Sequence, residues 1–162
     1  MQVIPASRLT FDSVDDWTES LMWKNLVAAL PGKVVIIFWL GQNDCDNFSK
    51  ALGTRPEQSK IDYYKGKMTR MLDRKEAYFQ EAVKHGKAKT YWISPSDEPG
   101  YDFTPQYIQM VSMLRNEIEG RKNHIKIPNM NHMTYEDDHY HVDPASRVKI
   151  ATILAARIRE LL

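Results

Sequence analysis

Two clusters of polar residues in this chain have the types and spacing that acid–base chemistry needs. The first follows the apolar run VVIIFWL at 34–40, where Gly41 leads into Asn43 and Asp44. An asparagine amide can donate a hydrogen bond to a developing oxyanion, and a glycine lets the backbone turn tightly. A loop in which Asn43 and Asp44 make turn hydrogen bonds explains the same residues. Both interpretations stand, with Gly41 and Asp44 as candidate binding residues.

The second cluster lies in DDHYHVDPASR at 137–147, where Asp138 and His141 are three residues apart. A carboxylate near an imidazole fixes its tautomer and stabilises the imidazolium that forms when it acts as a base. Two alternatives are an exposed polar loop capped by Asp143, and a metal site, because carboxylates and histidines are dense here. The segment lacks an HExxH motif, and His139 and His141 would point apart in an extended chain. We therefore expect no metal and no cofactor.

Strand-like and helix-like runs alternate along the chain and would position these clusters. The apolar, β-rich runs that predict strands are 34–40, 88–94, 124–128 and a weaker one at 2–5. The helices predicted from capping residues and helical spacing are 13–30, 61–84, 105–119 and 144–161. Such alternation predicts a mostly parallel sheet with helices on both faces. Ligands bind at the carboxyl ends of such strands, which is where Asn43 falls.

Length and composition limit the function classes. A chain of 162 residues fits a single domain at 1–162 with a sizeable core. The 22 basic and 21 acidic residues give no overall attraction to nucleic acid or membrane. The lone Cys45 excludes an internal disulfide and suits a reducing compartment. The longest apolar run is too short to span a bilayer and no signal-peptide pattern is present, so we expect an intracellular, cytoplasmic protein.

Together the two clusters resemble the SGNH (GDSL-type) hydrolase family. GQND at 41–44 is similar to its GxND block, DDHYHVDPASR to its DxxH block, and TYWISPSDEP at 90–99 to the segment between them. The resemblance covers roughly residues 30 to 162. It implies an α/β fold of three layers, flavodoxin-like, with a mostly parallel sheet of four to five strands. It also implies ester or thioester hydrolysis in intact members. By position, Asn43 would be the oxyanion donor, His141 the general base and Asp138 its orienting carboxylate.

The nucleophile block of the family is missing or degenerate. The only similar letters are FDS at 11–13, where a phenylalanine replaces the glycine of the Gly-Asp-Ser turn. Ser13 is therefore the candidate nucleophile, although pairing with Asp16 explains it equally as a helix cap. VIPASRL at 3–9 resembles the second block of the family instead. In that alignment the chain lacks the first, central strand, and the gap is closed by four strands or filled by a missing segment.

A basic, tyrosine-containing stretch at 60–89 suggests a second kind of function. A positive face with stacking groups is typical of RNA or single-strand binding, with Lys65, Lys67 and Arg70 as candidate contacts. The alternative is a solvated helix face on which acidic residues pair with the basic ones. The sequence thus predicts an SGNH-hydrolase-like pseudoenzyme that binds RNA or a protein partner. The alternative is an active esterase for small carboxylic esters, using Ser13 or a nucleophile from a segment missing here.

Overall fold

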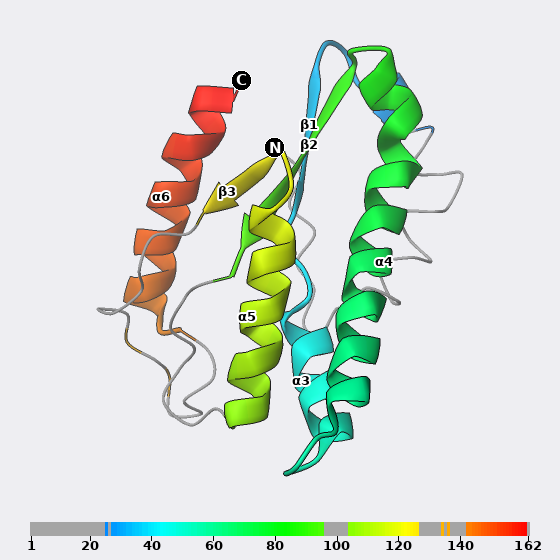
Figure 1. Ribbon diagram of the computed structural model, residues 1–162. Coiled ribbons are helices and arrows are strands. Elements are labelled where there is room, and N and C mark those ends of the chain that lie inside the picture. The colour runs from blue at the N-terminus through cyan, green and yellow to red at the C-terminus, as the bar shows by residue number, and fades with distance from the viewer. Residues whose placement is uncertain are drawn as a thin grey trace.

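The computed structural model describes residues 25, 27–95, 104–126, 134, 136 and 142–161. Along these residues the elements are β1 (Val34–Phe38), α3 (Gln42–Leu52), α4 (Gln58–Lys84), β2 (Ala88–Ser94), α5 (Pro105–Glu119), β3 (His124–Lys126) and α6 (Pro144–Leu161). Figure 1 shows α3, α4 and α5 grouped together, with α6 across the strands from them. Within the described ranges, no helix has the length and apolar character needed to cross a membrane.

The strands form a small parallel sheet in the order β1-β2-β3. In β1 and β2 the pairing runs from Val34 opposite Ala88 to Phe38 opposite Trp92. The prediction of a flavodoxin-like sheet with four to five strands is wrong, because the described residues form three strands that pair directly and leave no gap between them. The chain is largely helical instead, and α4 alone takes 27 residues. The weak strand candidate at 2–5 lies outside the described residues.

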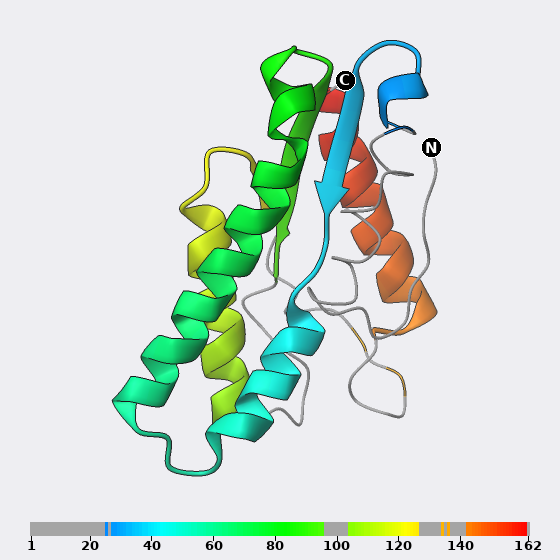
Figure 2. The same ribbon diagram turned by 90° about the vertical axis from the view of Figure 1, so that its right-hand side faces the viewer.

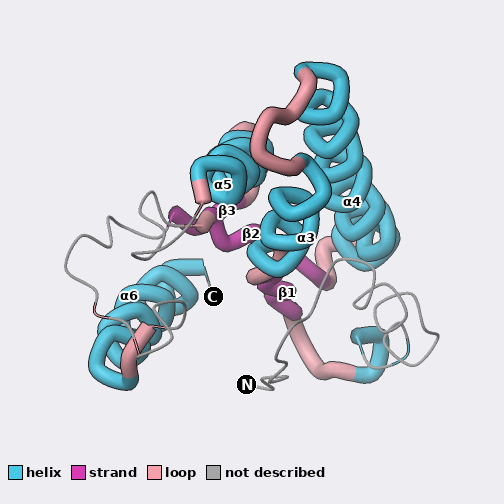
Figure 3. The backbone as a smooth tube through the Cα atoms, turned by 90° about the horizontal axis from the view of Figure 1, so that it is seen from below, coloured by secondary structure: helices cyan, strands magenta, loops and turns pink. Residues whose placement is uncertain are grey.

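Alternate side chains of β2 divide the apolar core between the two faces of the sheet, as the period of a strand requires. Trp92 stacks on Phe38 with ring centroids 4.7 Å apart, in the larger core that α3, α4 and α5 complete. Ile93 points the other way and packs with Ile125 and with Leu154 of α6. Figure 3 shows the strands between α6 and the three other helices. Helices therefore cover both faces of the sheet.

The beginnings of α5 and α6 confirm two caps that the sequence predicts. Thr104 Oγ1 accepts a hydrogen bond from the Tyr107 N–H at 3.2 Å, with proline at the first helical position. Asp143 Oδ1 accepts one from the Ser146 N–H at 2.7 Å, again ahead of a proline. Each cap satisfies an N–H group that a helix leaves without an intrahelical partner.

A polar network joins α4 to the sheet and to the segment after α5. Trp92 Nε1 donates to Glu76 Oε1 at 2.7 Å. Arg121 reaches Glu76 Oε2 with Nη1 at 2.8 Å and Asp73 Oδ1 with Nη2 at 2.7 Å. Two carboxylates on one flank of α4 are therefore held by a residue that follows α5, rather than by basic residues of their own helix.

Substitution of Leu114 tests the larger core. This leucine of α5 is fully buried, so Leu114→Ala is expected to lower the free energy of unfolding by about 2–5 kcal/mol through lost burial and a cavity. Urea unfolding followed by circular dichroism measures the change. Ile108→Ala on the same helix is the control, because Ile108 is 41% exposed and should lose far less. Equal losses at the two positions would contradict this packing.

Candidate functional site

The GQND segment lies at the carboxyl end of β1, in the first turn of a helix rather than in a loop (Figure 2). Gly41 is the residue before the helix and has φ 105°, a left-handed conformation that strains any residue with a Cβ. Its carbonyl accepts the Cys45 N–H at 2.9 Å, which is the first hydrogen bond of the helix. Gly41 therefore turns the chain directly from strand into helix.

Sequence reasoning missed α3, although its signals are present. Lys50 pairs with Asp46 one turn earlier at 2.6 Å, and Gly53 follows the last helical residue with φ 72°. Phe48 and Leu52 are buried at helical spacing from Cys45. A short apolar stripe in a largely polar segment is easily taken for a loop.

The side chains of the first turn of α3 differ in exposure. Asn43 is half-buried, whereas Asp44 is 3% exposed, and each takes part in interactions within the structure. The start of a helix favours a carboxylate, because the helix dipole is positive there. Asn43 is therefore a partly exposed residue just after the end of β1, while Asp44 belongs to the interior.

Cys45 is inert in this setting. It is fully buried among the residues of the larger core, and burial together with the neighbouring Asp44 carboxylate raises the pKa of its thiol. Because the thiolate is the reactive form, a thiol held protonated does not act as a nucleophile or a metal ligand.

Ser94, at the end of β2 within the TYWISPSDEP motif, also has a structural role. The residue is fully buried, and its hydroxyl donates to Glu119 Oε1 at 2.9 Å. Lys126 of β3 approaches the same carboxylate at 3.5 Å. This serine therefore joins β2 to the end of α5.

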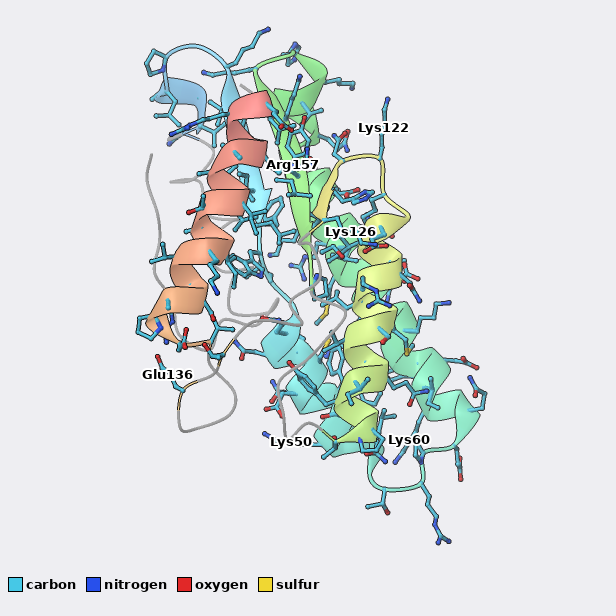
Figure 4. The ribbon with its side chains drawn as sticks, turned by 90° about the vertical axis from the view of Figure 1, so that its left-hand side faces the viewer. Lys50, Lys60, Lys122, Lys126, Glu136 and Arg157 are labelled. Carbon is cyan, nitrogen blue, oxygen red and sulfur yellow. The ribbon has the colours of Figure 1, made fainter. Side chains whose placement is uncertain are left out.

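The start of α6 is held by the residues that precede the DDHYH segment. The Thr134 N–H donates to Ser146 Oγ at 2.9 Å, and the Asp143 N–H donates to Thr134 O at 2.9 Å. Arg147 forms an ion pair with Glu136. Figure 4 shows Glu136 beside the start of α6. In Figure 1, α3 and α6 both begin on the side of the sheet where β1 ends. The residues that flank the second cluster thus lie on the side of the sheet that holds Asn43.

The remaining predicted catalytic residues are Ser13, Asp138 and His141, which lie outside the described residues. Their approach to Asn43 stays a prediction. Among the residues that the structure describes, no three or more histidines, cysteines and carboxylates gather as metal ligands would.

The basic residues of α4 fall on different flanks of the helix. Spacings of three and four residues place one set on a single flank, which we call the basic stripe: Lys60, Tyr63, Lys67, Arg70 and Arg74. Lys65 is two residues from Lys67 and so points to a different side of the helix. Lys75 is 1% exposed and belongs to the interior. The three candidate contacts predicted from the sequence therefore do not share a face.

Aromatic rings connect the basic stripe to α3. Tyr64 stacks on Phe48 at 4.8 Å between centroids, and Tyr63 meets Tyr64 edge-on at 5.2 Å. Lys67 Nζ lies 5.1 Å from the centroid of Phe48, which is a cation–π distance. Phe48 was missed by sequence reasoning because α3 itself was missed.

Asp62, Asp73 and Glu76 of α4 are not paired with Lys60, Lys67 or Arg70 of the basic stripe. Asp73 and Glu76 are held by Arg121, and Asp62 accepts a hydrogen bond from Gln58 at 2.9 Å. Within the described part of the chain, Lys60, Lys67 and Arg70 form no ion pair. These residues therefore do not form the intrahelical ion pairs that the alternative interpretation of the sequence predicts.

No protein-family model, curated protein or solved structure matches this chain. The resemblance to the SGNH hydrolases therefore rests on its short motifs alone and stays a prediction.

Acid titration tests the cap of α6. Hydrogen bonds from the Thr134 hydroxyl and then from the Ser146 N–H lower the pKa of Asp143 from its ordinary value of 3.8. The folded state thus favours the carboxylate, and this stabilisation is present above pH 3.8 and is lost as the pH falls through the folded-state pKa. Asp143→Ala is expected to lower the free energy of unfolding at pH 7, with the deficit shrinking on acidification.

Urea unfolding of both proteins from pH 7 to pH 3 measures that deficit. Glu160→Ala is the control, since Glu160 is an exposed residue near the other end of α6 and should change stability little at any pH. A deficit for Asp143→Ala that stays constant down to pH 3 would show that the cap does not depend on the charge.

Proposed function

We propose that this chain binds RNA through the basic stripe of α4, as a non-catalytic derivative of the SGNH hydrolases. The observation that carries the proposal is the division of charge on α4. Lys60, Lys67 and Arg70 lie on one flank together with exposed Tyr63, while Asp73 and Glu76 on another flank are engaged by Arg121. Cations neutralise phosphates and aromatic rings stack on bases, so both contributions to RNA binding are available on one surface.

The net charge of +1 does not oppose this proposal, because binding depends on the local distribution of charge. From Lys60 to Arg74 the stripe is about 21 Å long at the rise of an α-helix. That length suits several successive nucleotides of an extended strand. An intracellular, cytoplasmic location belongs to the proposal, since a single buried thiol suits a reducing compartment.

Neutralising two residues of the stripe tests the proposal. Binding of a fluorescein-labelled 12-nucleotide RNA is measured by anisotropy between 50 and 200 mM KCl. Binding of the unmodified protein should weaken steeply as salt rises, because phosphate contacts release counterions. The variant Lys67→Gln/Arg70→Gln should bind about tenfold more weakly at 50 mM, and its slope of log K against log salt should be smaller by about 1.4.

Two control variants separate the stripe from general charge. Lys65→Gln removes a charge from a different flank of the same helix and should change affinity less than twofold. Lys122→Gln/Arg159→Gln removes two charges elsewhere on the surface, and Figure 4 shows Lys122 in the segment between α5 and β3. Absence of RNA binding, or equal weakening by the two double variants, would count against the proposal.

Ester hydrolysis is the second candidate function, and one observation favours it. Asn43 lies at the end of β1, and the segment carrying Asp138 and His141 leads into α6, which begins on the same side of the sheet (Figure 1). In this proposal Asn43 donates to the oxyanion, His141 is the base and Asp138 orients it. The nucleophile is Ser13 or a serine from a segment outside this chain.

Turnover of p-nitrophenyl acetate tests this second candidate. Asn43→Ala is expected to reduce kcat by about 10²–10³-fold, as loss of an oxyanion donor does. His141→Ala should abolish turnover, and Ser13→Ala should do so where Ser13 is the nucleophile. Asn47→Ala is the matched control, because it removes an exposed amide one turn further along α3 and should leave kcat unchanged. No turnover in the unmodified protein would eliminate an esterase whose nucleophile is Ser13.

A further inference from the structure

Tyr63 is a large aromatic residue of the basic stripe that lies mostly outside the packed core. The side chain is 59% exposed, and its ring contact is the edge-on one with Tyr64, at 5.2 Å and 77°. By contrast, Tyr64 is half-buried and stacks on Phe48, which belongs to the larger core. Tyr64 therefore contacts the ring of Tyr63 and is itself held by Phe48, while Tyr63 remains largely exposed to solvent.

Cationic side chains flank this ring on the same side of the helix. Lys60 is three residues before Tyr63 and Lys67 is four residues after it, so both are its neighbours on the surface of α4. Arg70 continues the row one turn beyond Lys67. An aromatic ring between two cations matches a nucleotide strand, in which each base is flanked by phosphates on either side.

An exposed aromatic ring can stack on the bases of single-stranded RNA but not on those of a duplex. In a duplex, both faces of each internal base are covered by neighbouring base pairs, so a side chain cannot stack there without opening the helix. Bases of a single strand can be splayed out and stacked on aromatic side chains. Cations alone bind the phosphates of both forms, whereas a stacking residue adds affinity for the single strand alone.

We infer that Tyr63 stacks on an unpaired base and that the ligand of the basic stripe is single-stranded RNA. This inference rests on the proposed RNA binding and names the form of RNA that is bound. Lys67 and Arg70 supply phosphate contacts that depend on salt, and Tyr63 supplies a contact that does not. The two kinds of contact can therefore be removed separately.

The test compares a 12-nucleotide single strand with the 12-base-pair duplex of the same sequence, by anisotropy at one salt concentration with the full chain. The unmodified protein should bind the single strand at least about tenfold more tightly. Tyr63→Ala should weaken binding of the single strand at least about fivefold, as loss of one stacked base does, and leave duplex binding and the salt slope unchanged.

Two further variants control for folding and bulk. Tyr63→Phe keeps the aromatic face and should retain the affinity for the single strand. Tyr63→Leu keeps apolar contact with Tyr64 but has no π-face, so it should lose affinity as the alanine variant does. Thermal unfolding checks that each variant folds, which the exposure of Tyr63 leads us to expect.

The outcomes distinguish this inference from the proposal beneath it. Equal affinity for the two forms, or an unchanged affinity in Tyr63→Ala, overturns single-strand recognition and leaves RNA binding in place if Lys67→Gln/Arg70→Gln still weakens it. No binding to either form overturns the proposed function itself.

Discussion

The hydrogen bond from the Trp92 indole to Glu76 fixes which flank of α4 faces the sheet, together with the fully buried side chains of Met68 and Leu72. Trp92 is anchored in the sheet by its pairing with β1 and by the stack on Phe38, so Glu76 must face the end of β2. Arg121 then holds the second oxygen of Glu76 and, 48 residues along the chain from it, Asp73. With 3.6 residues per turn, fixing this flank fixes every other flank of the helix. The basic stripe lies on a different flank from the carboxylates that Arg121 engages.

Local features of the fold could be predicted from the sequence because they depend on local interactions. Thr104 and Asp143 each cap a helix through a contact three residues away, and the β-rich runs at 34–38 and 88–94 form paired strands. The number of strands could not be predicted in the same way. It was inferred from a family resemblance, and pairing between strands is a property of the whole chain rather than of any one motif.

Charge pairing on α4 shows how tertiary contacts override a local rule. Acidic and basic residues on one helix suggest intrahelical pairs, yet such pairs contribute only about 0.2–0.5 kcal/mol each and yield readily to a better partner. Arg121 is such a partner, since it is 13% exposed and its guanidinium binds two carboxylates at once. Lys65 and Lys67 are likewise close in sequence, and the sequence analysis predicts both as RNA contacts. The helical period places their side chains on different sides of α4. The pairing with Arg121 is not visible in a single stretch of sequence, because Arg121 follows α5, whereas the separation of Lys65 from Lys67 follows from the helical spacing of α4.

The helix α3 links the two functions considered for this chain. Its first turn carries the amide of Asn43 at the end of β1, where the family resemblance places an oxyanion donor. One turn later, Phe48 supports Tyr64 by stacking and lies under the ammonium group of Lys67. Cys45, three residues before Phe48, is buried in the larger core, and Phe48 points to the same side of the helix. The helix that begins with the GQND segment thus also supplies Phe48, which contacts Tyr64 and Lys67 beside the basic stripe. The aromatic contacts beneath Tyr63 and Lys67 therefore depend on α3.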